Sequence, residues 1–175
     1  MGSHIYVDET KERGFLLVAA TLDTSYLTAA RATVGRLVFR GQRSIHFCKE
    51  RDERRRQILR AFRDLPVEIV IYDATAYRNV KRARDACLRG LVSDAAKAAA
   101  ERLVLDLDES CLGSDRSLLG RELGAVGMAG RLRYDHLDAH ADHLLAIPDA
   151  VAWSWAKGGQ WRAMVRRMIG EVRNV

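Results

Sequence analysis

Runs of apolar residues separated by short polar stretches define the elements that this chain is expected to form. The first two runs, residues 4–9 and 13–21, are joined by a short polar turn and predict a β-hairpin. The second run, RGFLLVAAT, is apolar along most of its length. Such a run is typical of a central strand in a sheet that is covered on both faces.

Beyond the hairpin, segments with helical spacing of apolar residues alternate with short apolar runs. Strands are expected over 44–47, 67–73, 103–108 and 131–137. Helices are expected over 23–38, 50–62, 78–102 and 114–123, from about Pro148 onward, and in a last segment where Trp161, Met164, Val165, Met168, Ile169 and Val172 share one face. This order predicts an α/β fold in which a hairpin is followed by strand–helix units, with helices on both faces of a mixed sheet. Residues 1–175 are expected to form a single domain.

The charge balance is basic, with 29 Lys and Arg against 23 Asp and Glu, which hints at a nucleic-acid partner. Two predicted helices carry most of the arginines that could contact phosphate. Solvated helix faces explain these arginines as well, and the acidic residues Asp52 and Glu53 in the first helix weaken the phosphate interpretation there. The candidate nucleic-acid contacts are Arg54, Arg55, Arg162 and Arg166.

The three cysteines, Cys48, Cys87 and Cys111, are far apart and form no CxxC pair, so neither a disulfide framework nor a zinc site is expected. No run of about 18 apolar residues occurs, so no membrane partner is expected. These features favour a cytoplasmic protein. The apolar face that contains Trp161 could support a homodimer, although packing on the sheet is the simpler alternative.

Acidic residues stand close to the predicted strand ends and helix starts, where functional residues of α/β sheets gather. Asp106 and Asp108 are two residues apart, so a continuous strand would place both on one face. Several carboxylates at one sheet edge repel each other unless they are protonated or bridged by a divalent cation. Oxygen ligands of this kind suit Mg²⁺ or Mn²⁺. The candidate metal ligands are Asp8, Glu9, Glu50, Asp106, Asp108 and Asp149.

Each of these acids also has a purely structural explanation. Asp149 and Glu50 could be first-turn acids that stabilise a helix dipole, and Asp106 could pair with Arg102. Asp8 is the hardest to explain in this way, because it lies on the short apolar strand IYVDET. An unpaired carboxylate buried on a strand costs on the order of several kcal/mol.

The segment YDHLDAHADH, 134–143, contains His136, His140 and His143. On a helix these three would share one side and could bind a transition metal. Their spacing differs from the usual zinc signatures, and the segment crosses from a predicted strand into a helix. The favoured interpretation is that His140 lies near the carboxylates and assists proton transfer or product release.

Four motifs, taken in order, resemble the bacterial proteins grouped as domain of unknown function 3800, in particular their actinobacterial members. The motifs are YVDET, IHF with a following Glu, LVLDLDES, and LLAIPDAVAW followed by GGQWR. The resemblance spans almost the whole chain. It implies a ribonuclease H-like fold with the acidic site of a metal-dependent nuclease.

Carried over by position, the resemblance makes Asp8 the first-strand carboxylate and Asp149 the carboxylate on the late helix. One acid of LVLDLDES would be the later-strand carboxylate, with Asp108 favoured over Asp106. Glu50 is a poor match to the helical glutamate of ribonuclease H, because a helix is inserted before it. The implied catalytic residues are Asp8, Asp108, Asp149 and His140.

The resulting hypothesis is a nuclease that uses two Mg²⁺ or Mn²⁺ ions and acts on RNA, which is favoured over DNA, or on an RNA-containing duplex. The alternative is a non-catalytic nucleic-acid- or protein-binding module on the same fold. In that alternative the acids would be structural hydrogen-bond acceptors.

Overall fold

The computed structural model describes residues 2–175 and contains one six-stranded sheet with strand order β5-β4-β1-β2-β3-β6. The strands are β1 (Ser3–Thr10), β2 (Leu16–Asp23), β3 (Glu68–Asp73), β4 (Arg102–Asp106), β5 (Arg133–Leu137) and β6 (Ile169–Asn174). The α-helices are α1 (Leu27–Leu37), α2 (Asp52–Arg63), α3 (Val80–Lys97), α4 (Glu109–Ala125), α5 (Ala146–Lys157) and α6 (Gly159–Val165). Short 3₁₀ turns are η1 (Thr24–Tyr26), η2 (Phe47–Lys49), η3 (His143–Leu145) and η4 (Arg166–Met168).

The sheet is mixed, as the sequence predicts. β1 and β2 form the expected antiparallel hairpin, and β3 pairs antiparallel with β2. On the other side of the hairpin, β1, β4 and β5 run parallel to one another. β6 lies beside β3 and runs parallel to it. The carboxyl ends of β1, β4 and β5 therefore meet at one edge of the sheet, where α/β folds usually build their sites.

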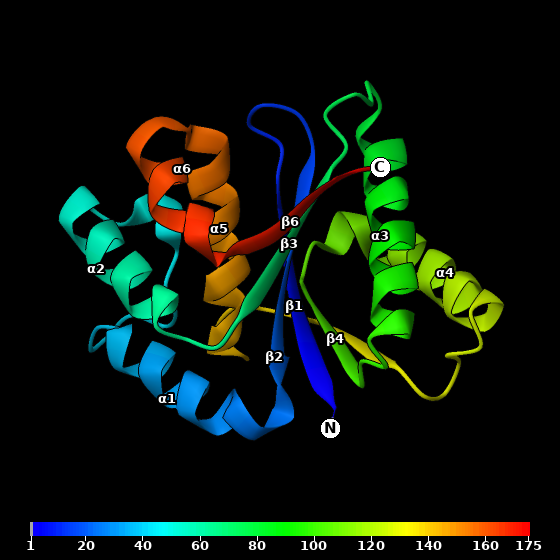
Figure 1. The fold of residues 1–175 in the computed structure, drawn as a ribbon, viewed down its shortest axis with the longest axis horizontal. Helices are drawn as coiled ribbons and strands as arrows, with labels where there is room; N and C mark the ends of the chain where they lie inside the picture. The colour runs from blue at the N-terminus through cyan, green and yellow to red at the C-terminus, as the bar shows by residue number, and fades with distance from the viewer. Residues whose placement is uncertain (1) are drawn as a thin grey trace.

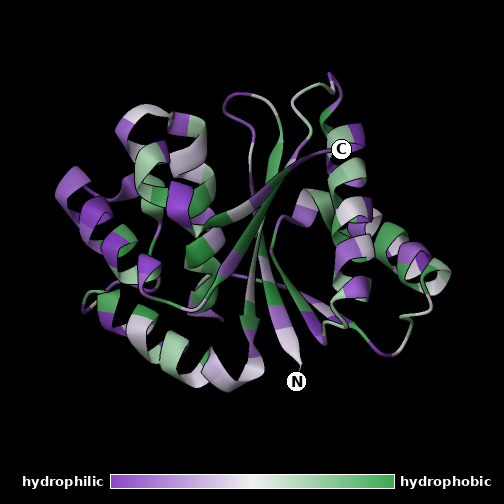
Figure 2. Cartoon of the chain, viewed as in Figure 1, coloured by the Kyte–Doolittle hydropathy of each residue, from purple (hydrophilic) through white to green (hydrophobic). Residues whose placement is uncertain are grey.

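Helices cover both faces of the sheet (Figure 1). α1, α2, α5 and α6 lie on one face, and α3 and α4 lie on the other. Alternating residues of β1 enter the two cores: Tyr6 packs under α5, whereas Ile5 and Val7 pack under α3 and α4. Figure 2 shows hydrophobic residues on the central strands and hydrophilic residues along the outer surface of α2. Burial in these two layers is the main force that holds the helices to the sheet.

Several predicted elements differ from the structure. Residues 44–47 form no strand; they are loop that leads into η2, because no sheet edge lies beside them to pair with. The predicted last helix stops at Val165, and its final residues form β6 instead. α4 begins at Glu109 rather than near Ser114, because the Asp108 carboxylate caps it.

The apolar face around Trp161 does not form a free surface. Trp161 is only 6% exposed and packs in the core between α5, α6 and the sheet. Because Trp161 is packed in this way, it offers no exposed apolar face for a homodimer. Among residues 2–175, none of the helices has the length and apolar character needed to cross a bilayer.

Candidate active site

Two neighbouring parallel strands bring Asp8 and Asp106 together. Val7 on β1 is the partner of Leu105 on β4, so Asp8 and Asp106 follow directly where the pairing of the two strands ends. Strand alternation turns both side chains towards the face covered by α5, because the preceding same-face residues, Tyr6 and Val104, belong to that core. The strand register therefore places two carboxylates next to each other.

The third carboxylate comes from the helix that packs over these strands. Asp149 lies in the first turn of α5, which contacts β1 and β2. Its Oδ2 accepts a hydrogen bond of 3.1 Å from the backbone N–H of Phe47, in the turn before α2. Pro148 fits the first turn of α5, where the helix needs no backbone N–H donor. α5 thus presents Asp149 to the strand ends.

Asp8, Asp106 and Asp149 line one cavity of about 290 Å³. The opposite walls of the cavity come from two loops. One lies between α1 and η2 and contributes Arg43 and His46, and the other follows β5 and contributes residues 138–140. The cavity therefore has three carboxylates on the sheet and on α5, while its loops contribute Arg43, His46 and His140 together with a fourth carboxylate, Asp138.

Burial is the largest cause that raises the pKa of each of the three carboxylates. Burial is the largest cause for Asp8, whose pKa lies well above its usual value, and the charges of Asp149 and Asp106 raise it further. Burial, followed by the charges of Asp149 and Asp138, raises the pKa of Asp106 to about 6. Burial also raises the pKa of Asp149, although the bond from Phe47 opposes this shift. Negative charge is therefore concentrated here, and the charge of Arg84 only partly offsets it at Asp8 and Asp106.

The donor chemistry of this cavity fits Mg²⁺ or Mn²⁺, since both prefer oxygen ligands. Within residues 2–175, no three His, Cys, Asp or Glu side chains form a group that could hold a metal ion unaided. Mg²⁺ in enzymes commonly keeps several waters and binds through one or two carboxylates together with substrate phosphate. The carboxylates of the cavity fit such a shared shell, in which they would hold the cation together with waters and a substrate phosphate.

Glu9 does not join this cavity. As the next residue along β1, it points to the opposite face of the sheet and forms ion pairs with Arg84 of α3 and with Lys11. Arg84 is 4% exposed and also donates two hydrogen bonds, of 2.8 and 2.7 Å, to Asp115 of α4. Asp115 in turn bonds to His136 Nε2 at 2.9 Å. Glu9 is thus part of a buried charge network that ties β1 and β5 to α3 and α4.

Asp108 and Glu50 also lie outside the three-carboxylate cavity. β4 ends at Asp106, and Asp108 accepts a 3.0 Å hydrogen bond from the backbone N–H of Ser110 as the N-cap of α4. A hydrogen bond from the Ser110 hydroxyl and, to a smaller extent, the bond from its backbone N–H lower the pKa of Asp108. Glu50 accepts a 2.8 Å bond from Gln42 and lies 4.0 Å from the Arg54 guanidinium. The structure therefore brings Asp8, Asp106 and Asp149 together in one cavity, whereas Asp108 lines a smaller cavity of about 80 Å³ that Asp8, Glu9 and Asp106 also line.

Three of the four candidate phosphate-binding arginines make contacts within the protein. Arg54 is 8% exposed and stacks on Phe39, with its guanidinium carbon 3.9 Å from the ring centroid. Arg55 donates to the carbonyls of Phe47 and Cys48. Arg162 donates to the carbonyl of Trp155 at 2.9 Å, while Arg166 is exposed.

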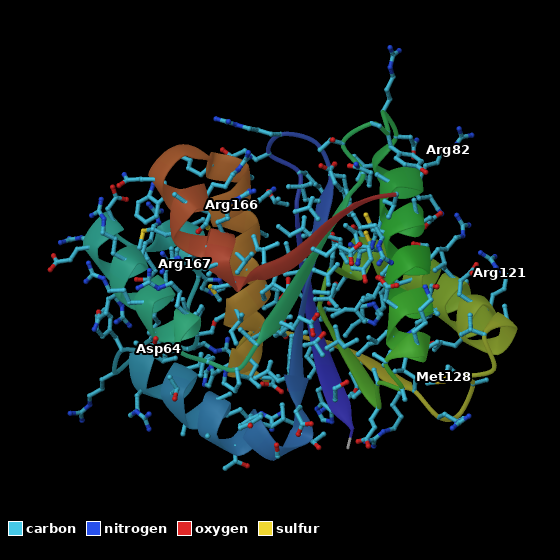
Figure 3. All side chains as sticks on the ribbon, viewed as in Figure 1. Asp64, Arg82, Arg121, Met128, Arg166 and Arg167 are labelled. Atoms are coloured by element: carbon cyan, nitrogen blue, oxygen red, sulfur yellow. The ribbon has the colours of Figure 1, made fainter. Side chains whose placement is uncertain are left out.

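Exposed arginines lie on both sides of the sheet. Figure 3 shows Arg166 and Arg167 on the side of α5 and α6, and Arg82 and Arg121 on the side of α3 and α4. The positive charge is thus divided between two flanks rather than gathered in one stripe.

The three histidines of 134–143 do not form a common site. His136 bonds to Asp115, on the far side of the sheet from the cavity. His143 lies in η3, where its Nδ1 is buried without a hydrogen-bond partner. His140 lines the cavity, as expected of a histidine near the carboxylates.

Sequence patterns did not point to Arg43, His46 or Asp138 as cavity residues. The loop of Arg43 and His46 was interpreted partly as a strand, and its position depends on contacts with distant α5. The motif IHF, residues 45–47, is the sequence signal that could have identified this loop as part of the cavity.

No protein-family model and no curated protein matches this sequence. Among solved structures, the chain is similar to a ribonuclease HII in the structure of the PCNA:RNase HII complex from Archaeoglobus fulgidus, with a TM-score of 0.59 and 12% sequence identity. The match covers 94% of this chain and 78% of that one. Together with the six-stranded mixed sheet, this similarity shows that the chain has a ribonuclease H-like fold.

Proposed function

We propose that this protein is a metal-dependent nuclease that hydrolyses phosphodiester bonds in RNA or in an RNA-containing duplex. The observation that carries the proposal is the grouping of Asp8, Asp106 and Asp149 around one cavity. Burial raises the pKa of all three, the charges of neighbouring carboxylates raise the pKa of Asp8 and Asp106 further, and a divalent cation would relieve that repulsion. The preference for RNA rests on the sequence resemblance and on the similar chain being a ribonuclease HII.

The three carboxylates would have different roles. Asp8 and Asp106, on adjacent strand ends, would hold the cation. Asp149, oriented by the Phe47 N–H, would accept a hydrogen bond from the attacking water and direct it to the phosphorus atom. When bound, Mg²⁺ or Mn²⁺ supplies the positive charge that activates water and stabilises the leaving oxygen. Asp106, rather than Asp108, takes the later-strand position in this proposal.

The alternative of a non-catalytic binding module is less well supported. It uses basic helices as the binding surface, but Arg54, Arg55 and Arg162 already bond within the protein. It also requires the acids to serve as structural hydrogen-bond acceptors. Glu9 and Asp108 fit that description, whereas Asp8 accepts only from the adjacent Glu9 N–H, at 2.7 Å.

A cleavage assay with a labelled RNA–DNA hybrid in Mg²⁺ or Mn²⁺ tests the proposal. The wild-type protein should cleave the hybrid, and Asp8→Asn should not, while both should have the same circular dichroism spectrum. The matched control is Asp64→Asn, because Asp64 is exposed at the end of α2 (Figure 3) and does not line the cavity. Binding of the hybrid without any cleavage by the wild type would favour the binding module instead.

A further inference from the structure

Arg43 lies on the loop between α1 and η2, and its side chain lines the cavity together with the three carboxylates. Its Nη2 donates a 3.0 Å hydrogen bond to Nε2 of His140, which comes from the loop after β5. A guanidinium has donors only, so His140 Nε2 must carry the lone pair in this contact. The bond therefore joins the two loops that form the cavity wall facing the sheet and α5.

The guanidinium of Arg43 makes no ion pair with any residue of 2–175, although four aspartates line the same cavity. Arg84 and Arg31, by contrast, pair directly with aspartates. The Arg43 side chain is also exposed. Its positive charge is thus available at the mouth of an otherwise acidic cavity.

A polyanion that enters a cavity with several carboxylates is repelled by them unless a cation faces it. Arginine suits that position, because its planar fork donates two parallel hydrogen bonds to phosphate oxygens. Arg43 comes from the loop between α1 and η2, so it would meet the phosphate from a different side than Asp8, Asp106 and Asp149 do.

We propose that Arg43 binds a phosphate of the nucleic-acid backbone in this cavity, and that His140 is the positioning residue that holds Arg43 across the mouth. This inference rests on the proposed nuclease function. Contacts of this kind orient the strand without reading its bases, so Arg43 should act on every sequence equally.

The test is fluorescence anisotropy with a short labelled RNA–DNA hybrid in Mg²⁺. Every protein carries Asp106→Asn so that the hybrid remains intact. Arg43→Ala should weaken binding by roughly tenfold or more, as expected for the loss of a charged hydrogen bond. The plot of log affinity against log salt concentration should also become less steep, by the amount expected for the loss of about one phosphate contact. The control is Arg40→Ala, an exposed arginine on the same loop that does not line the cavity.

A double-mutant cycle tests the positioning role of His140. His140→Ala should weaken binding less than Arg43→Ala does, and should have no further effect once Arg43 is alanine. Additive effects of the two substitutions would show that His140 does not act through Arg43.

Different results would contradict the Arg43 proposal alone or both proposals together. If Arg43→Ala and Arg40→Ala bind with the same affinity and salt slope while the wild type still cleaves the hybrid, the Arg43 proposal is wrong and the nuclease function stands. If the wild type neither binds nor cleaves the hybrid, both proposals fail.

Discussion

The backbone N–H of Phe47 donates a 3.1 Å hydrogen bond to Oδ2 of Asp149, which joins the turn before α2 to the first turn of α5. The same turn is held from its other side by Arg55, whose Nε donates to the Phe47 carbonyl at 3.0 Å and whose Nη2 donates to the Cys48 carbonyl at 2.7 Å. Arg55 also stacks over Trp153, one turn after Asp149 on α5. An arginine expected to bind phosphate is therefore a support for the acidic cavity.

Arg55→Ala should consequently impair both stability and cleavage. It removes two hydrogen bonds to backbone carbonyls and leaves the turn free to move away from Asp149. We expect a loss of about 1–3 kcal/mol in the free energy of unfolding, measured by urea denaturation, together with a lower kcat. Arg60→Ala on the exposed side of α2 is the control. Equal behaviour of the two variants would contradict this role.

Asp106→Asn and Asp108→Ala should separate the two acids of LVLDLDES. Asp106 lines the cavity, so its substitution should abolish cleavage of the hybrid while the fold is kept. Asp108 is the N-cap of α4, so Asp108→Ala should cost about 1 kcal/mol of stability and retain most of the activity. Denaturation curves and initial cleavage rates measure the two effects. Loss of activity in Asp108→Ala but not in Asp106→Asn would show that Asp108, rather than Asp106, is the catalytic acid.

The raised pKa of Asp106 predicts a pH-dependent stability. Burial and neighbouring carboxylates raise that pKa to about 6, whereas an aspartate in the unfolded chain titrates near 3.9. The folded protein therefore binds more protons within this window, and its stability falls as the pH rises through it. Asp106→Asn should raise Tm at about pH 7 and have little effect below about pH 4.

Scanning calorimetry of Asp106→Asn and wild type across this range measures the difference. The shifts of Asp8 and Asp149 have the same sign, so added Mg²⁺ should raise the Tm of the wild type more than that of the variant. A Tm difference that stays constant with pH would argue against a strained carboxylate at position 106.

Arg84→Ala should be among the most destabilising substitutions of a charged residue. Arg84 is buried and pairs with both Glu9 and Asp115, so its removal leaves the buried Asp115 carboxylate without its guanidinium and leaves Glu9 with Lys11 alone. Removing one partner of a buried ion pair lowers the free energy of unfolding by roughly 3–5 kcal/mol. Arg82→Ala, on the exposed side of the same helix, should change stability little (Figure 3). Urea denaturation of both variants checks the difference, and similar midpoints would contradict it.

The fold was largely predictable, because apolar periodicity is preserved in nearly every strand and helix. The exception at the carboxyl terminus has a clear origin. Ile169 and Val172 are three residues apart, which suits a helix, but the exposed edge of β3 was free to pair with this segment as β6. Gly170 also lowers the helix propensity of this segment. The local spacing of apolar residues was compatible with a helix or a strand. Pairing with the distant strand β3 decided in favour of the strand.

The site was harder to predict than the fold. A two-residue spacing places Asp106 and Asp108 on one face only if the strand continues, and the cap formed by Asp108 ends the strand before that. Strand alternation does predict that Asp8 and Glu9 point to opposite faces, as the structure has them. Arg43 and His46 lie on a loop whose course is set by the contact of Phe47 with α5, and periodicity carries no information about such contacts.

The acidic cavity takes its walls from β1, near the amino terminus, and from α5, which follows most of the remaining chain. Chains emerge from the ribosome starting at the amino terminus, so β1 and Asp8 are exposed long before Asp149 is synthesised. Incomplete chains therefore lack one wall of the cavity.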